Sequence, residues 1–139
     1  MIYCNCDSGG MKKDPEQQKE MERRLAEEEK IVGHVPVVHQ ILSDRPDMLL
    51  PNLDVSESMF AGEKVLPHKV KHLIALGAAV AGGSPYCIRA QMENAKMFGA
   101  TEDEILEALQ IASYMGMTRG QSISFRVFAD VFGKEYTLR

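Results

Sequence analysis

The sequence lacks tryptophan and has only three cysteines, Cys4, Cys6 and Cys87, among its 139 residues. An odd number of cysteines cannot all pair within one chain, and no export leader opens the sequence, so we do not expect a disulfide framework. Reactive or metal-binding thiols are the better interpretation of these three side chains.

Long hydrophobic runs are also missing. The longest apolar stretch, residues 73–81, is about half of the roughly 20 residues that a helix needs to cross a bilayer. The net charge is −4, and the basic residues are scattered among acidic ones without a positive stripe for a phosphate backbone. We therefore expect a cytoplasmic protein that binds neither a membrane nor nucleic acid.

What is present is apolar material for one core, since 45% of the residues are hydrophobic. The patterns are helical throughout, which predicts an all-α fold. Residues 1–11, with Cys-Asn-Cys followed by Asp-Ser-Gly-Gly, are too short and polar to form an element. We expect them to be a flexible N-terminal arm, followed by one helical domain over residues 12–139.

The first half of the domain contains three predicted helices. Asp14 followed by Pro15 is typical of an N-cap with proline at the first helical position, and the charged run to Lys30 is rich in helix formers. A short apolar helix is expected over residues 35–42, and a helix of weaker periodicity over residues 46–59.

The pattern sharpens after Pro67, where small and apolar residues repeat at helical spacing until Gly82 and Gly83. The stripe consists of Val70, Leu73, Ile74, Gly77, Ala78 and Ala81. A second helix should begin at the Ser84 cap and run to Phe98, ended by a left-handed Gly99.

Two more helices are expected near the C-terminus. Thr101 and Glu104 form a capping box that opens the first of them. The last helix is expected over roughly residues 119–132 and should bury four apolar side chains, those of Ile123, Val127, Phe128 and Val131.

Cys87 lies in the first turn of the helix that Ser84 caps, where the positive end of the helix dipole favours a thiolate. A nucleophilic thiol is one interpretation. The other is that Cys87 is a small buried hydrophobic residue and Ser84 simply a helix cap.

His68 and His72 lie four residues apart, on the helix face opposite the apolar stripe. This spacing lets two imidazoles bind one metal ion, although histidines on a polar face are more often solvated. His34 and His39 flank a short apolar segment and are assigned no role.

Cys4 and Cys6 form a redox pair, supply two ligands for a soft metal, or have no function. Together with Cys87 they would give three sulfur ligands for zinc or an iron–sulfur cluster. The fourth ligand would be His72 or a cysteine of a second subunit.

Two stretches resemble the core signature of the carboxymuconolactone decarboxylase and alkylhydroperoxidase AhpD-like family. The first is LPHKVKHLIALGAAVAGGSPYC over residues 66–87, and the second is GATEDEILEA over residues 99–108. The resemblance implies an AhpD-like helical bundle that assembles as a dimer, trimer or hexamer, with an active cleft near the cysteine turn and the subunit contacts.

In the AhpD branch, two cysteines form a Cys-x-x-Cys turn, a glutamate lies on the preceding helix, and a histidine follows four residues after the second cysteine. This chain keeps the second cysteine as Cys87 but has Ser84, His72 and Gln91 at the other three positions. A serine cannot resolve a sulfenic acid, so the AhpD cycle cannot run on this turn alone. Cys4 or Cys6 could replace the missing thiol.

The resulting prediction is a thiol oxidoreductase that reduces a small-molecule or protein disulfide, or a peroxide. Cys87 would be the nucleophile, with His72 as its base and Ser84 beside it. One alternative is a cofactor-free lyase or isomerase acting on small carboxylated ring compounds through histidines. The other is a non-catalytic, oligomeric binding protein.

Overall fold

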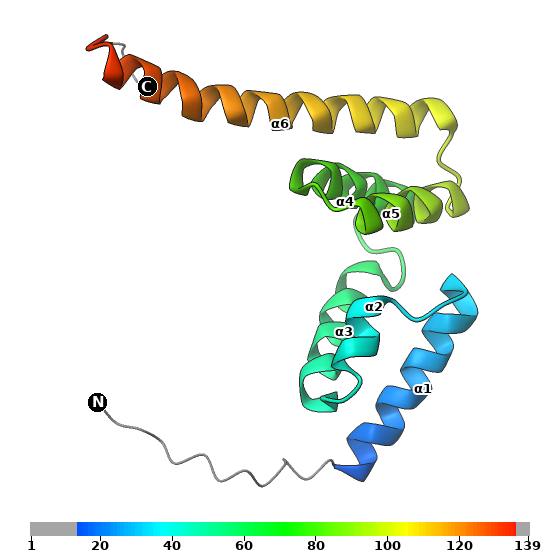
Figure 1. Cartoon of the computed structure of the whole chain (residues 1–139). Coiled ribbons are helices and arrows are strands. Elements are labelled where there is room, and N and C mark those ends of the chain that lie inside the picture. Colours follow the sequence, from blue (N-terminus) through cyan, green and yellow to red (C-terminus); the bar gives the residue numbers. More distant parts are fainter. Residues whose placement is uncertain (1–13, 136–139) are drawn as a thin grey trace, which may run out of the picture. The chain divides into compact units, whose positions relative to one another are not determined.

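The computed structural model describes residues 14–135, without the side chain of Val32. These residues form six helices and contain no strand, which confirms the all-α prediction (Figure 1). The helices are α1 (Pro15–Val32), α2 (Val37–Leu42), α3 (Pro46–Phe60), α4 (His68–Gly82), α5 (Pro85–Met97) and α6 (Glu102–Val131). The predicted arm over residues 1–11, with Cys4 and Cys6, lies outside the described residues.

The chain divides into two compact units with a boundary between Ala61 and Gly62. The first unit contains α1 to α3. Its core is formed by Met21, Leu49 and Leu53, with Leu25, Leu42 and Leu50 packed against them. The predicted N-cap is confirmed, because an Asp14 carboxylate oxygen accepts a hydrogen bond of 3.0 Å from the backbone N–H of Glu16.

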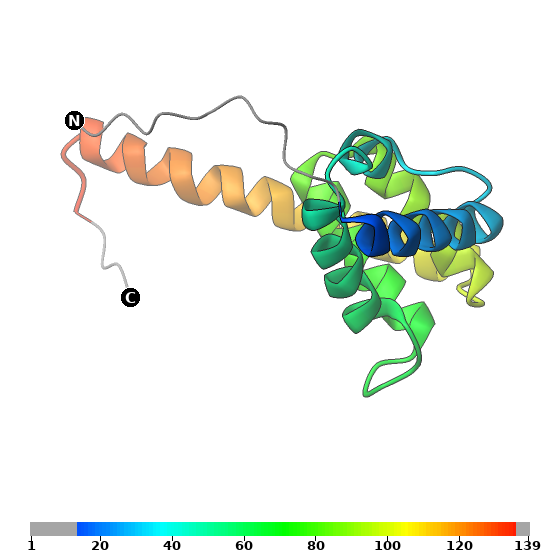
Figure 2. The ribbon, with the colours of Figure 1, turned by 90° about the horizontal axis from the view of Figure 1, so that it is seen from below.

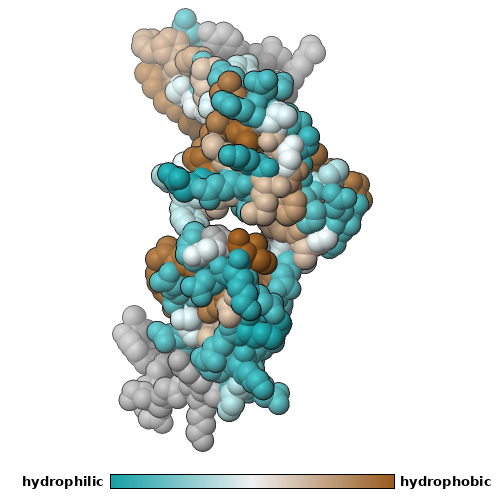
Figure 3. All heavy atoms as spheres, turned by 90° about the vertical axis from the view of Figure 1, so that its right-hand side faces the viewer, coloured by the Kyte–Doolittle hydropathy of each residue, from teal (hydrophilic) through white to brown (hydrophobic). Residues whose placement is uncertain are grey.

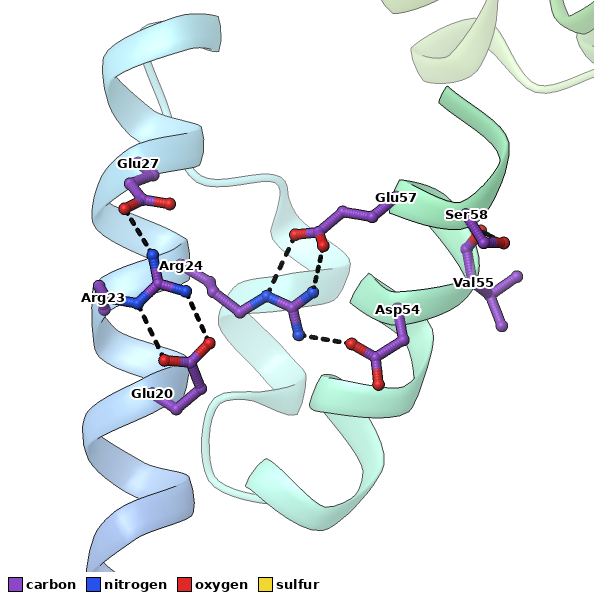
Figure 4. A network of polar contacts seen from close by, with 8 residues as sticks. All are labelled: Glu20, Arg23, Arg24, Glu27, Asp54, Val55, Glu57 and Ser58. Atoms are coloured by element: carbon purple, nitrogen blue, oxygen red, sulfur yellow. Dashed lines mark hydrogen bonds and ion pairs between the residues drawn. The ribbon is translucent and has the colours of Figure 1, made fainter. Parts of the chain in front are cut away.

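An arginine ties α1 to α3 in this unit (Figure 4). The Arg24 guanidinium lies 2.7 Å from Asp54 Oδ1 and 2.7 Å from Glu57 Oε2, and its side chain is only 10% exposed. Hydrogen bonding to Glu57 raises the pKa of Arg24 above its ordinary value. The neighbouring Arg23 pairs with Glu20 and Glu27, which both lie on α1.

The second unit contains an antiparallel hairpin, α4 and α5, with α6 packed against α4. Gly83 makes the hairpin turn with φ of 69°, a left-handed conformation that side-chain-bearing residues avoid. Leu76 is fully buried, and Gly77 faces Ala112 of α6, where an added Cβ would meet the alanine methyl at 3.9 Å. Small residues therefore allow α4 and α6 to approach closely.

The prediction of two separate C-terminal helices is wrong, because α6 is continuous over 30 residues. Residues 113–118 contain no proline, and the Ser113 and Thr118 hydroxyls bond back to carbonyls of the preceding turn. Gly116 and Gly120 are unfavourable helix residues, but they do not break a helix that is well formed on both sides.

The predicted burial of the last helix is also wrong for the described part of the chain. The C-terminal half of α6 runs beyond α4 and α5 in both ribbon views (Figures 1 and 2). Four residues expected inside, Ile123, Val127, Phe128 and Val131, are between 47% and 70% exposed. Apolar surface also reaches the exterior of both units on the face drawn in Figure 3. None of the described helices combines the length and apolar character required to cross a membrane.

Candidate active site

The N-terminus of α5 presents the cysteine turn. Ser84 occupies the N-cap position with extended backbone angles and Pro85 follows it, as the sequence predicts. The Ser84 side chain makes no capping hydrogen bond, however, so that part of the prediction is wrong. Its backbone is held instead, since Ser84 N–H donates to Ala79 O at 3.1 Å and Ser84 O accepts from Ile88 N at 2.9 Å.

Cys87 follows in the first turn of α5 as an exposed cysteine without a disulfide among the described residues. The alternative that it is a small buried hydrophobic residue is therefore wrong. An exposed thiol at the start of a helix lies where solvent-borne substrates can reach it.

His72, on α4, faces α5 rather than solvent. It is only 5% exposed, and its Nδ1 lies 2.8 Å from Oε1 of Gln91. A carbonyl oxygen only accepts, so Nδ1 donates this hydrogen bond. Gln91 is four residues after Cys87, about 6 Å along the helix axis and on the same face.

The two histidines of α4 share one aromatic neighbour. The ring of Phe98 lies 4.5 Å from His68 and 5.2 Å from His72, centroid to centroid, with interplanar angles of 12° and 6°. His68 Nδ1 is buried and has no hydrogen-bond partner in the described chain. The expectation that this pair lies on a solvated face is wrong.

Sequence reasoning treated Phe98 only as the end of a helix. The predicted pair of antiparallel helices could have identified Phe98 as a neighbour of the histidines. Residues equally far from the turn lie at the same level of two antiparallel helices, because each residue rises 1.5 Å. His68 and Phe98 both lie 15 residues from Gly83, on opposite sides of it.

The same end of the hairpin is bound to α6 by Lys69 and Glu104. Lys69 Nζ lies 2.8 Å from Glu104 Oε1, while Glu104 Oε2 accepts from Thr101 N at 2.8 Å in the predicted capping box. The hydrogen bond from Lys69, followed by that from Thr101, lowers the pKa of the Glu104 carboxyl. One carboxylate thus fixes both the start of α6 and its contact with α4.

Only one of the three predicted sulfur ligands is among the residues that the structure describes. Cys87 is described, whereas Cys4 and Cys6 lie outside residues 14–135. In the described part, no group of three or more histidine, cysteine, aspartate or glutamate side chains is placed to hold a metal ion. The described residues therefore do not form such a site by themselves, and the three-sulfur site stays a prediction.

Residues 46–128, more than half of the chain, match the sequence model of the carboxymuconolactone decarboxylase family. The chain belongs to this carboxymuconolactone decarboxylase family. No curated protein and no solved structure gives a significant match. The match begins at α3 and ends near the end of α6. It therefore includes every described residue of the candidate site.

Proposed function

We propose that the protein is a thiol oxidoreductase of the AhpD-like class, with Cys87 as its nucleophile. The observation that supports this most is the hydrogen bond of 2.8 Å between His72 and Gln91. These residues occupy the two positions at which the AhpD branch has its proton-relaying glutamate and histidine. They retain a polar link one helical turn from an exposed cysteine.

In the proposed reaction with a disulfide, His72 takes the thiol proton of Cys87 through Nε2, directly or through one water. The Cys87 thiolate attacks one sulfur, so a Cys87–substrate disulfide forms while the substrate disulfide breaks. The released thiolate takes the proton back from His72. Ser84, three residues before Cys87, is the proposed hydrogen-bond donor to the reacting sulfur.

The second half of the cycle requires another thiol, and Cys4 or Cys6 is the proposed source. Its thiolate attacks Cys87 Sγ, releases the second substrate thiol and leaves a disulfide between the two cysteines. A dithiol reductant then supplies two electrons and restores both thiols. With a peroxide, Cys87 becomes a sulfenic acid and the same thiol displaces water. Such a cycle fits a reducing compartment, the cytoplasm.

The test compares Cys87 alkylation and disulfide reduction in the wild type, His72→Gln and His39→Gln. His39 is the matched control, because its Nδ1 bonds Glu28 in the first unit at 2.7 Å. We expect His72→Gln to slow both reactions at least tenfold at pH 7 and His39→Gln to leave them unchanged. Wild-type reactivity no higher than that of an ordinary exposed cysteine would reject the proposal.

A metal-bound form of the site is part of the proposal, with Cys4, Cys6 and Cys87 as sulfur ligands for zinc or an iron–sulfur cluster. Zinc, iron and acid-labile sulfide should be measured on protein prepared without oxygen. Bound metal that is lost in Cys87→Ser would support this form. Wild-type protein without metal would reject the metal-bound form and leave the mechanism that uses the thiols alone.

The buried, hydrogen-bonded imidazole of His72 also favours a second candidate, a lyase or isomerase that acts on small carboxylated ring compounds through histidines. Replacing all three cysteines with serine separates the two candidates. The lyase would keep its activity, whereas the thiol oxidoreductase would lose it.

We also propose that the protein is a homo-oligomer, in agreement with the exposed apolar side chains of distal α6. Phe125 is 65% exposed and Ile123 is 59% exposed, yet a helix in water normally turns such residues toward a partner. Light scattering should give a mass above that of one chain, and Phe125→Asp should lower it. A monomeric wild type would contradict this proposal.

A further inference from the structure

We infer that Phe98 is a positioning residue that fixes the ring plane of His72 and thereby keeps its proton on Nδ1. The inference rests on the proposed function only for the role of His72 as the base that takes the proton of Cys87. The placement of the ring itself follows from contacts within α4 and α5.

The stacking geometry is that of a specific aromatic contact. Parallel rings attract when their centroids are about 4.5–7 Å apart, and Phe98 satisfies this toward both imidazoles. Its plane deviates from that of His72 by only 6°. A rotation of the imidazole about its χ2 bond would tilt it out of this plane and lose the contact.

The hydrogen bond to Gln91 restrains the same imidazole along a second direction. Without the stack, the imidazole could tilt until the bond to Gln91 bends and weakens. Without the bond, the stacked ring could flip so that its two nitrogens exchange places. Phe98 and Gln91 together leave one orientation, in which Nδ1 donates to Gln91 Oε1.

The backbone that carries Phe98 is itself fixed. Phe98 N donates to Asn94 O at 3.0 Å, and Ala100 N donates to Ala95 O at 2.9 Å across a left-handed Gly99. Ala95 and Ala100 are buried. The ring therefore stands on an anchored helix end rather than on a loose loop.

Packing of the core does not by itself require an aromatic ring at this position. The Phe98 side chain is 42% exposed, although a large apolar side chain gains most when it is fully buried. The contacts that distinguish it are those with His68 and His72. His68 stacks on the same Phe98 ring, so both histidines of α4 contact it.

The experiment records the ring nitrogens of ¹⁵N-labelled histidine by NMR in the wild type, Phe98→Leu, Phe98→Met and Phe98→Tyr. Phe60→Leu, at the end of α3 in the first unit, is the matched control. We expect His72 to show a single Nδ1–H form in the wild type, Phe98→Tyr and the control. Phe98→Leu and Phe98→Met should show a mixture of both protonated nitrogens, together with altered ring-current shifts of His68.

An unchanged Nδ1–H signature of His72 in both aliphatic variants would overturn the inference, as would its absence from the wild type. Phe98→Met serves as the second variant if Phe98→Leu does not fold. The rate of Cys87 alkylation, measured on the same samples, separates the two proposals. A mixed His72 signal confined to Phe98→Leu and Phe98→Met, with ordinary Cys87 reactivity in every sample, would support the role of Phe98 and reject the thiol oxidoreductase.

Discussion

At the scale of single residues, His72 of α4 and Gln91 of α5 join the two helices of the hairpin through a hydrogen bond. A glutamate and a histidine in the AhpD pattern correspond here to His72 and Gln91, and the two side chains still meet at 2.8 Å. The sequence predicts each replacement, because the motif fixes the positions. It does not predict that His72 is buried, since burial depends on α5 covering this face of α4.

Gln91→Leu should destabilise the second unit by about 1–3 kcal/mol, because it leaves a buried imidazole N–H without its acceptor. Chemical denaturation measures the change. Gln110→Leu, at an exposed position on α6, is the control and should change stability by less than about 0.5 kcal/mol. Equal effects of the two substitutions would show that the bond to His72 contributes nothing specific.

Glu104 should make the second unit sensitive to acid. Its folded-state pKa is lowered from the ordinary 4.5, so its stabilising effect is present above that value and is lost as the pH falls through the lowered pKa. The melting temperature of Glu104→Gln should therefore lie below that of the wild type at pH 7 and approach it as the pH falls through the lowered pKa of Glu104. Parallel pH curves of the two proteins would contradict the role of this carboxylate.

At the scale of elements, helix ends were predictable and helix continuity was not. Asp14, Gly83 and Thr101 act through local rules, because a cap or a left-handed glycine depends on a few neighbouring residues. Whether α6 continues through Gly116 depends on the helix propensities and contacts of all its residues together. No short motif encodes this sum. The same applies to Phe98, whose importance comes from a register between two helices.

Gly116→Ala should stabilise α6 by about 1 kcal/mol, because Gly116 lies inside a helix and nothing lies within 4 Å of the added methyl group. Gly99→Ala should have the opposite sign, since φ of 84° costs an alanine about 1–2 kcal/mol. Thermal unfolding of both variants at the same protein concentration measures this contrast. A destabilising Gly116→Ala would indicate that another chain packs closely against that position.

At the scale of the whole molecule, the sequence predicts a flexible arm and one helical domain over residues 12–139. Contacts group the described chain into two compact units, with the boundary after Ala61. Each part has its own buried residues, Leu49 among them in the first unit and Leu76 in the second. Composition could not foresee this division, because it depends on which helices pack together rather than on how apolar they are.

Leu49→Ala tests whether the two units unfold separately. It should cost the first unit about 2–5 kcal/mol, because Leu49 is fully buried against Met21 and Leu53. Hydrogen exchange should then show faster exchange in α1 and α3 and unchanged protection in α4 and α5. Uniform loss of protection along the chain would instead support one cooperative domain.

The hairpin turn at Gly83 also has a consequence for how this chain tolerates changes in length. Each residue inserted into a helix turns everything after it by about 100°. One extra residue between His72 and Gly83 would swing His68 and His72 together away from Gln91 and Phe98. Insertions and deletions should therefore be accepted between Ala61 and Pro67, outside the helices, and should abolish the paired histidine site anywhere from His72 to Gln91.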